Sequence, residues 1–189
     1  MQFLKKIFFI AFSLVLFSCD KDDDNPNTPV DADSLIGSWT LVSLEADTDL
    51  ETEIPGFPPV DSSTKSIGEN MDYELTFTET EYEVTGGYDL VTNGTVNGEV
   101  MDEDRQTISN VSQKGTYELR DGVLILDNSL YELEAAGTEI NEYLKDYEVD
   151  LSFNSNGELV MREKAEVTFN EEGLALTVDV DADSVWKRK

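Results

Sequence analysis

Residues 71–85 read Met71-Asp72-Tyr73-Glu74-Leu75-Thr76-Phe77-Thr78-Glu79-Thr80-Glu81-Tyr82-Glu83-Val84-Thr85, and this stretch decides the fold. Its first half alternates apolar and polar side chains, which is typical of a strand with one face buried and the other in water. Glu79 and Thr80 interrupt the pattern, and a second alternating run follows. The stretch therefore predicts two antiparallel strands joined by a tight turn.

The same strand–turn–strand unit recurs along the chain. Asp121-Gly122 separates two strand-like runs, and an Asp-Gly pair in that position strongly favours a hairpin. Further turns are predicted at 154–157 and 170–173, each between runs of alternating apolar residues. Hairpins at short spacing predict an antiparallel sheet, which must close or fold over to cover its edges. We therefore predict an all-β fold of about eight to ten strands for residues 35–189.

Two segments depart from this pattern. Apolar residues between 140 and 147 recur at the spacing of a helix, so residues 139–146 are predicted as one short helix, with a strand as the alternative. The stretch 45–70 is long and acidic and carries three prolines between positions 55 and 59. Because proline cannot sit in a central strand, this stretch is predicted as an extended loop over one end of the sheet.

The amino end differs in composition from the rest of the chain. Lys5 and Lys6 precede an apolar run from Ile7 to Phe17, which is too short to span a hydrocarbon core and is typical of a cleavable signal peptide. The segment after Cys19 is rich in Asp and carries two prolines, which predicts a flexible tether. We predict three parts: a signal peptide over 1–18, a tether over 19–34, and one folded domain over 35–189.

Leu16-Phe17-Ser18-Cys19 resembles the bacterial lipobox, which has Leu at −3, a small residue at −1 and then Cys. The resemblance implies that the Cys19 sulfur carries a diacylglycerol, that the signal is cut before it, and that the new amine is acylated, as with palmitate. Two or three acyl chains anchor a protein stably, where one is marginal. The alternatives are a buried core cysteine behind an ordinary signal peptide, or an uncleaved membrane helix.

The acidic run Asp20-Lys21-Asp22-Asp23-Asp24 resembles the export signal of surface lipoproteins in Bacteroidetes-type bacteria. In those proteins, a Lys among several acids just after the lipidated Cys directs the chain to the outer face of the outer membrane. The resemblance therefore implies a lipid-anchored protein at the cell surface. The alternative is a simple linker on a lipoprotein that faces the periplasm.

Residues 35–43, Leu35-Ile36-Gly37-Ser38-Trp39-Thr40-Leu41-Val42-Ser43, resemble the G-x-W first strand of lipocalins, and most closely the lipocalin-like domains of bacterial lipoproteins. Stretches 73–78 and 115–126 resemble a second strand and a mid-domain hairpin of the same domains. The resemblance implies an antiparallel up-and-down lipocalin-like β-barrel. In that family the Trp, here Trp39, plugs the closed end, and Arg188 is the candidate for the Arg that covers it. Classical lipocalins also have a disulfide, which a single cysteine cannot form.

Charge and composition exclude several classes of function. The chain has 13 Lys+Arg against 41 Asp+Glu, whereas nucleic acids and anionic headgroups attract basic surfaces. It has no His, and its one Cys is predicted to carry lipid, which removes Ser-His-Asp and Cys-His catalysis and the usual zinc ligands. We therefore predict a protein that is not an enzyme and needs no cofactor. A hydrolase using two carboxylates is the weakest alternative.

Three alternate acids near the carboxyl end, Asp179, Asp181 and Asp183, resemble the first half of a calcium loop. Ser184 stands where that loop needs a Gly, and the sequence ends before a bidentate Glu could follow. These acids are therefore weak metal candidates. The alternative is the solvent face of a strand whose valines point inward.

The candidate ligand-binding residues are the aromatic side chains expected inside the barrel: Trp39, Tyr73, Phe77, Tyr82, Tyr117, Phe153 and Phe169. A barrel open at one end would bind a small hydrophobic or amphipathic ligand, whereas in a small barrel these side chains would fill the interior. The first case is a surface-anchored, non-catalytic binding module. The second is an accessory protein that presents loops such as 45–70 to another envelope protein or glycan. A cavity of about 300 Å³ or more favours the first, and a solid interior with an exposed apolar patch near Phe57 favours the second.

Overall fold

The computed structural model describes residues 30–131, 134–135, 138–139, 147–171 and 174–189. Within these residues there are one short helix and eleven strands. The elements are α1 (Ala32–Leu35), β1 (Gly37–Glu53), β2 (Val60–Phe77), β3 (Glu81–Val96), β4 (Glu99–Val100), β5 (Asp104–Arg120), β6 (Val123–Leu126), β7 (Glu134–Ala135), β8 (Thr138–Glu139), β9 (Tyr147–Phe153), β10 (Leu159–Glu171) and β11 (Leu174–Arg188).

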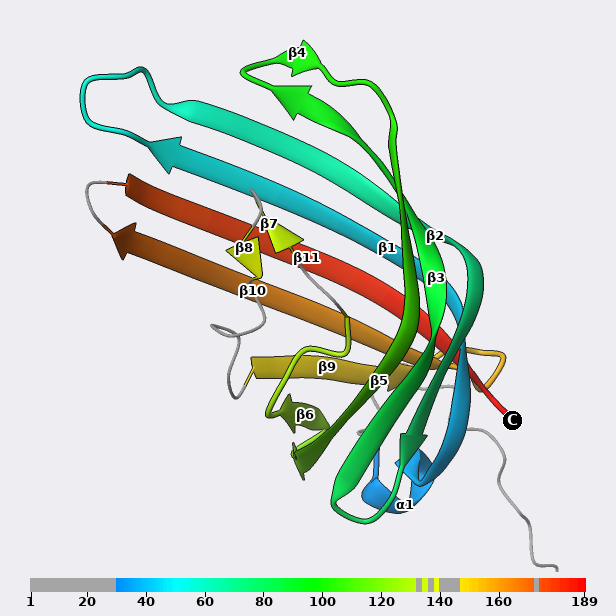
Figure 1. Ribbon diagram of the computed structural model, residues 1–189. Coiled ribbons are helices and arrows are strands. Elements are labelled where there is room, and N and C mark those ends of the chain that lie inside the picture. Colours follow the sequence, from blue (N-terminus) through cyan, green and yellow to red (C-terminus); the bar gives the residue numbers. More distant parts are fainter. Residues whose placement is uncertain (1–29, 132–133, 136–137, 140–146, 172–173) are drawn as a thin grey trace, which may run out of the picture.

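Eight of these strands form a closed antiparallel barrel (Figure 1). The order around the barrel is β1, β2, β3, β5, β6, β9, β10 and β11, and β11 pairs with β1 to close the ring. β4 extends the sheet beside β3, while β7 and β8 form a separate small sheet. Each ring strand is followed around the barrel by the next ring strand in the chain, with only β4 and the β7–β8 pair inserted between them, so the predicted all-β, up-and-down barrel is confirmed. Its architecture is consistent with that of lipocalins.

Alternation of side chains between water and the interior produces these strands. In the lower half of β2, Tyr73, Leu75 and Phe77 are buried, while the intervening polar residues face outward. The same period of two runs through β11, where Val180 and Ala182 are buried between the exposed acids Asp179, Asp181 and Asp183. Burying every second side chain removes one apolar face from water, which is the main stabilising contribution to such a sheet.

The predicted turns at 79–80, 121–122 and 154–157 are confirmed. Residues 78–80 join β2 to β3, and the Gly157 N–H donates to the Asn154 carbonyl at 2.9 Å between β9 and β10. Asp121 and Gly122 have φ values of 52° and 84°, the left-handed pair that a type I′ hairpin turn requires. At the end of the β10–β11 hairpin, Glu171 pairs with Leu174, which fits the turn predicted at 170–173.

The prediction of a loop over 45–70 is wrong. β1 continues to Glu53 and β2 begins at Val60, so the connection between them is confined to residues 54–59. The strands pair regularly up to this turn, with Leu50 opposite Ser62. All three prolines lie within the turn, where they interrupt no hydrogen bond of the sheet.

The helix found in the structure is not the one that the sequence predicts. α1 begins after Asp31, whose carboxylate accepts a hydrogen bond from the Ser34 backbone N–H at 2.7 Å and so caps the helix. It occupies the end of the predicted tether, and Val30 is already buried, so the folded domain begins earlier than residue 35. The helix predicted over 139–146 lies outside the described residues, apart from Glu139 in β8.

One end of the barrel is plugged by α1 and Trp39. The Trp39 indole N–H donates to the Leu35 carbonyl at 2.9 Å, and both side chains are buried. The Arg188 guanidinium carbon lies 4.4 Å from the centre of the Trp39 ring. Its nitrogens donate to the Ile36 carbonyl at 2.9 Å and to the Ser34 carbonyl. The predicted contact between Arg188 and Trp39 is therefore present.

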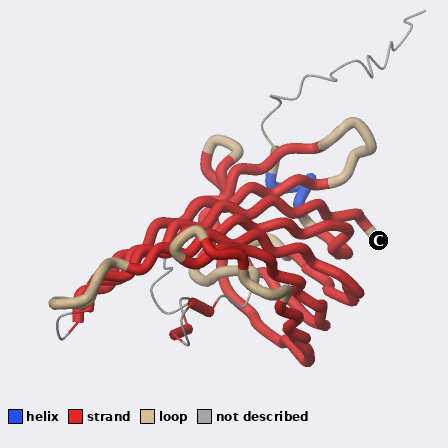
Figure 2. Tube along the Cα trace, turned by 90° about the horizontal axis from the view of Figure 1, so that it is seen from above, coloured by secondary structure: helices blue, strands red, loops and turns tan. Residues whose placement is uncertain are grey.

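The barrel wall differs in height around its circumference. β1, β2, β3 and β5 have between 16 and 18 residues, whereas β6 has 4 and β9 has 7. The long hairpins β1–β2 and β10–β11 reach to one side beyond the short strands (Figures 1 and 2). The wall is consequently high around β1–β5 and low at β6 and β9, away from the plugged end.

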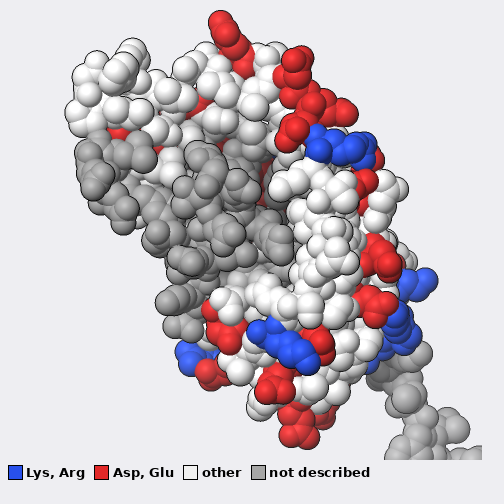
Figure 3. Space-filling model, in the orientation of Figure 1, with Lys and Arg blue, Asp and Glu red and all other residues white. Residues whose placement is uncertain are grey.

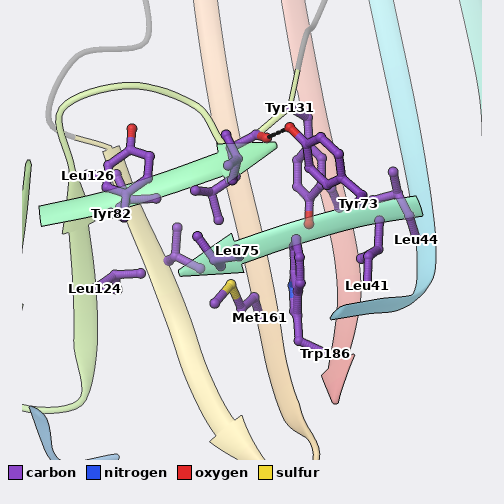
Figure 4. Packing of buried hydrophobic residues seen from close by; sticks show 14 of the residues in the cluster. Leu41, Leu44, Tyr73, Leu75, Tyr82, Leu124, Leu126, Tyr131, Met161 and Trp186 are labelled. Carbon is purple, nitrogen blue, oxygen red and sulfur yellow. Dashed lines mark hydrogen bonds between the residues drawn. The ribbon is translucent and has the colours of Figure 1, made fainter. Parts of the chain in front are cut away.

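All the buried apolar side chains of the described residues except Val91 belong to one cluster, which runs in sequence from Val30 to Trp186. Figure 4 shows part of this cluster, with side chains from several strands meeting inside the barrel. Because the first long strand pairs with the last, the core and the ring are both completed within residues 30–189. The described residues therefore share one core and one ring of strands.

Candidate ligand-binding cavity

The barrel interior is hollow at the end opposite Trp39. A cavity of about 380 Å³ lies there, between the upper halves of β1, β2 and β3, the start of β5, and Ala182 of β11. Tyr131, in the segment after β6, also lines it. This volume falls at the lower end of the range of about 300–1,000 Å³ that is usual for small-molecule sites.

Strand register places five lining residues at one level of the wall. Ala46 pairs with Ala182 on one side and with Ser66 on the other. Ser66 pairs in turn with Thr92, and Thr92 with Asp104. Residues directly opposite each other on paired strands point to the same face of the sheet. These five side chains therefore form a belt along the inner wall.

Aromatic rings form the floor of the cavity. Tyr88 and Tyr131 line it, with ring centroids 6.5 Å apart and ring planes at 88°. Tyr73 and Trp186, both fully buried, pack behind them (Figure 4). The Tyr73 hydroxyl donates to the Leu130 carbonyl at 2.7 Å, a buried hydrogen bond that fixes the chain after β6 against the floor.

A buried carboxylate lies at the same height as the belt. Glu163 of β10 pairs with Ala182 and is 6% exposed. Burial raises the pKa of the Tyr131 hydroxyl well above its ordinary value, and the charge of Glu163 raises it further, whereas a hydrogen bond with Ser184 lowers it. Tyr131 therefore stays protonated at neutral pH.

The wall above the floor combines apolar and hydroxyl-bearing side chains. The hydroxyl oxygens of Ser66 and Thr92 lie 2.8 Å apart, and the Thr64 hydroxyl donates to the Thr48 carbonyl at 3.4 Å. Apolar lining comes from Leu44, Ala46, Leu50, Leu90 and Met101. Such a wall suits a ligand that has an apolar body and a few hydrogen-bonding groups.

The predicted ligand-binding aromatics occupy a different part of the barrel. Trp39 and Phe153 pack at the plugged end with ring centroids 6.1 Å apart, and Phe77 and Tyr117 form an edge-to-face pair at 5.0 Å. Tyr73 lies behind the floor. None of the six predicted aromatics with described side chains lines the 380 Å³ cavity. They fill the interior below the cavity, where the barrel is closed and their large rings exclude water from the core.

Tyr82 and Phe169 complete that set. The Tyr82 hydroxyl donates to a carboxylate oxygen of Asp127 at 3.2 Å and to the Asn128 carbonyl at 3.1 Å. Tyr82 also lines a separate hollow of about 280 Å³ beside Lys114. Phe169 lies in β10, and its side chain is outside the described residues.

The other predicted sites lie away from the cavity or outside the described residues. Cys19 belongs to the latter group. Asp179, Asp181 and Asp183 are exposed on the outer face of β11, where Lys164 reaches Asp181 at 2.7 Å and Arg162 reaches Asp183 at 3.1 Å. In the part of the chain that the structure describes, no group of three or more His, Cys, Asp or Glu side chains is arranged to hold a metal ion.

Many cavity residues were missed because they lie in the stretch predicted as a loop. A usable pattern was present there: Ala46, Thr48 and Leu50 alternate with Asp47, Asp49 and Glu51. An acid at every second position indicates the solvent-exposed face of a strand, even where the opposite face is only weakly apolar. The alternation of charge, rather than of hydrophobicity, could have located this wall.

A second exposed feature lies at the far end of the β1–β2 hairpin. Phe57 is 71% exposed in the turn, and Ile54 beside it is 45% exposed. The turn is also the part of the hairpin that extends furthest from the plugged end (Figure 1). It therefore offers a small apolar surface to another molecule.

Comparison of the chain with protein-family models, with curated proteins and with solved structures found no match. Among the described residues, no helix has both the length and the apolar character needed to cross a membrane. Arguments about function therefore rest on the sequence and on the geometry of the barrel.

Proposed function

We propose that the chain is a lipoprotein anchored at the outer face of the outer membrane, and that its barrel is a non-catalytic binding module for a small hydrophobic or amphipathic ligand. The observation that carries ligand binding is the 380 Å³ cavity above a packed and plugged base. Leu44, Leu90 and the rings of the floor supply an apolar surface, and the hydroxyls of Ser66 and Thr92 in the belt supply hydrogen-bonding groups.

Support for the anchor comes from the amino end of the sequence. Lys5, Lys6 and the apolar run precede a lipobox-like stretch that ends at Cys19, and an acidic run follows it. The absence of His from the sequence supports a binding role over catalysis, because it removes the most common proton-transfer group.

Ligand binding is tested with a variant that fills the cavity. Ala46→Phe places a phenyl ring on the inner wall, and Val42→Phe is its control, because Val42 is 46% exposed on the outside of the same strand. An uncharged, environment-sensitive dye should bind the soluble chain 20–189 and the control, and should lose most of its affinity for Ala46→Phe. Equal binding by all three would place the dye on the surface and refute use of the cavity.

The natural ligand is sought by native mass spectrometry of the protein purified from its own host. We expect a small non-covalent mass on the parent chain that is absent from Ala46→Phe. A mass that corresponds to the unliganded chain, together with dye binding that Ala46→Phe does not change, would refute the proposal.

Anchoring is tested in the host cell by fractionation. Cys19→Ser should yield an unprocessed or detached product, while Ser18→Ala, which keeps a small residue before the cysteine, should remain in the membrane in its mature form. A Cys19→Ser product that fractionates with membranes in mature form, as the parent does, would refute lipidation. Protease treatment of intact cells then shows whether the barrel faces the exterior.

A second candidate function is presentation of the β1–β2 turn to another envelope protein or glycan. The exposure of Phe57 favours it, because exposed large apolar side chains grouped together mark interaction surfaces. A photo-crosslinking residue at position 57 on whole cells should then give one discrete product. Absence of any product, with the same residue introduced at the exposed Val42 as a control, would argue against this role.

A further inference from the structure

The charged side chains that line the cavity all have the same sign. Asp102 and Asp104 are among the described lining residues, and no Lys or Arg is. Both acids are exposed, on the high side of the wall where β5 begins. Charged groups at the edge of the cavity are in a position to contact a bound ligand.

Within the described residues, no basic side chain forms an ion pair with either of these two carboxylates. Arg105 is adjacent in sequence, but its side chain points to the outer face, where it reaches Glu69 at 2.8 Å and Asp89 at 3.5 Å. The negative charge of Asp102 and Asp104 therefore remains available at the cavity.

The surrounding surface has the same sign. Glu99, Asp102, Glu103 and Asp104 are exposed around β4 and the start of β5. Figure 3 shows acidic side chains gathered at the top of the molecule over these elements. Low-dielectric walls beside charges of one sign concentrate the opposite charge, which here means cations.

The deeper part of the cavity has no described cationic side chain either. Glu163 of β10 lies at the height of the belt without lining the cavity, and the rings of Tyr88 and Tyr131 line the floor. Aromatic faces carry partial negative charge and attract cations. An anionic head would have to be desolvated without a cationic partner on any described wall, which is costly.

We propose that the ligand of this cavity is an organic cation, an amphiphile whose ammonium or guanidinium group lies at Asp104 and Asp102 and whose apolar body lies against Leu44, Leu90 and Tyr88. This inference rests on the proposed ligand-binding function and adds the charge and orientation of the ligand. Asp104 is the principal partner, because its register with Thr92 places it in the belt of the inner wall.

Three probes with one common chain test the inference: octylammonium, octanol and octanoate. They present a positive, a neutral and a negative head on the same apolar body, and their binding to the soluble chain 20–189 is measured by calorimetry. We expect octylammonium to bind most tightly and octanoate least tightly. Asp104→Asn should weaken octylammonium binding by about 2- to 5-fold, the range for an exposed charge pair, and leave octanol unchanged.

Glu103→Gln is the matched control. It removes the same charge from the neighbouring position, and Glu103 does not line the cavity. It should leave the preference for octylammonium over octanol nearly unaltered. If it weakens octylammonium binding as much as Asp104→Asn does, the preference reflects the general field of an acidic protein, and the assigned site is wrong.

Failure of this inference is distinguishable from failure of the proposed function. If octanol and octanoate bind as tightly as octylammonium, and Ala46→Phe removes all three, the cavity is a ligand site but has no preference for cations. If no probe binds, or if Ala46→Phe binds the probes as tightly as the parent chain does, the proposed binding function is refuted along with the charge preference.

Discussion

Replacing Arg188 tests the plug that closes the barrel. This side chain joins the last strand to the segment before the first one, through hydrogen bonds to the Ile36 and Ser34 carbonyls and a contact with the Trp39 ring at 4.4 Å. Arg188→Met keeps an unbranched apolar stem but removes the guanidinium group. The Ile36 and Ser34 carbonyls then lose their donors, and the Trp39 face loses its cation.

The structure sets the size of the expected effect. Hydrogen bonds from a charged donor contribute about 1.5–3 kcal/mol, and a cation–π contact at an exposed site contributes about 0.5–1 kcal/mol. Because Arg188 is exposed, solvent can replace part of these contacts. We therefore expect a loss of about 2–3 kcal/mol in the free energy of unfolding, or about 5–10 °C in Tm for a domain of this size.

Urea unfolding of the soluble chain 20–189, followed by tryptophan fluorescence, measures this loss. Lys187→Met is the control, since Lys187 is exposed on the same strand and its replacement removes the same charge. Arg188→Lys, which keeps the charge but not the forked donors, should fall between the parent and Arg188→Met. Equal destabilisation by Lys187→Met and Arg188→Met would show that net charge, rather than the plug, determines the effect, and would refute the reasoning.

Two further predictions concern the outer wall. Gly86→Ala should destabilise the domain by more than about 3 kcal/mol and abolish folding in many conditions, because a Cβ there would lie 1.8 Å from a β2 backbone carbonyl oxygen. Gly56→Ala, also at positive φ but with open space around it, should cost only about 1 kcal/mol, and comparable losses from both would rule out the clash as the cause. The pKa of Asp89 lies below its ordinary value because the Asn70 amide and the Thr107 hydroxyl donate to the carboxylate and Arg105 is nearby. The stabilising contribution of the Asp89 carboxylate is therefore present above about pH 4 and is lost as the pH falls through the folded-state pKa. Thr107→Val should raise this pKa toward the ordinary value in an NMR titration, and an unchanged value would contradict the assigned cause.

The part of the fold that hydrophobic alternation can specify was predictable from the sequence. Tyr73, Leu75 and Phe77 lie where the barrel is packed solid, so each inward position needed an apolar residue and the period of two was plain. Asp121 and Gly122 identified their hairpin because the turn needs two left-handed residues. Both signals come from local physical requirements.

The upper strands escaped prediction for the opposite reason. Thr48, Thr64 and Ser66 face a hollow rather than a packed core, so their positions did not need large apolar side chains. The same absence of packing makes this region a candidate site. The aromatic residues that were predicted as ligand contacts pack in the closed half of the barrel, and the pair Trp39 and Phe153 is the clearest case.

The plug also determines where a tether would join the barrel. α1 enters the domain beside Trp39 and Arg188, whereas the hollow opens at the other end of the strands. A tether between a lipid anchor and α1 would therefore be attached at the sealed base, and the opening of the cavity would lie at the opposite end of the barrel. Because the point of attachment is at the sealed base, the tether would leave the opening of the cavity unobstructed whatever its length.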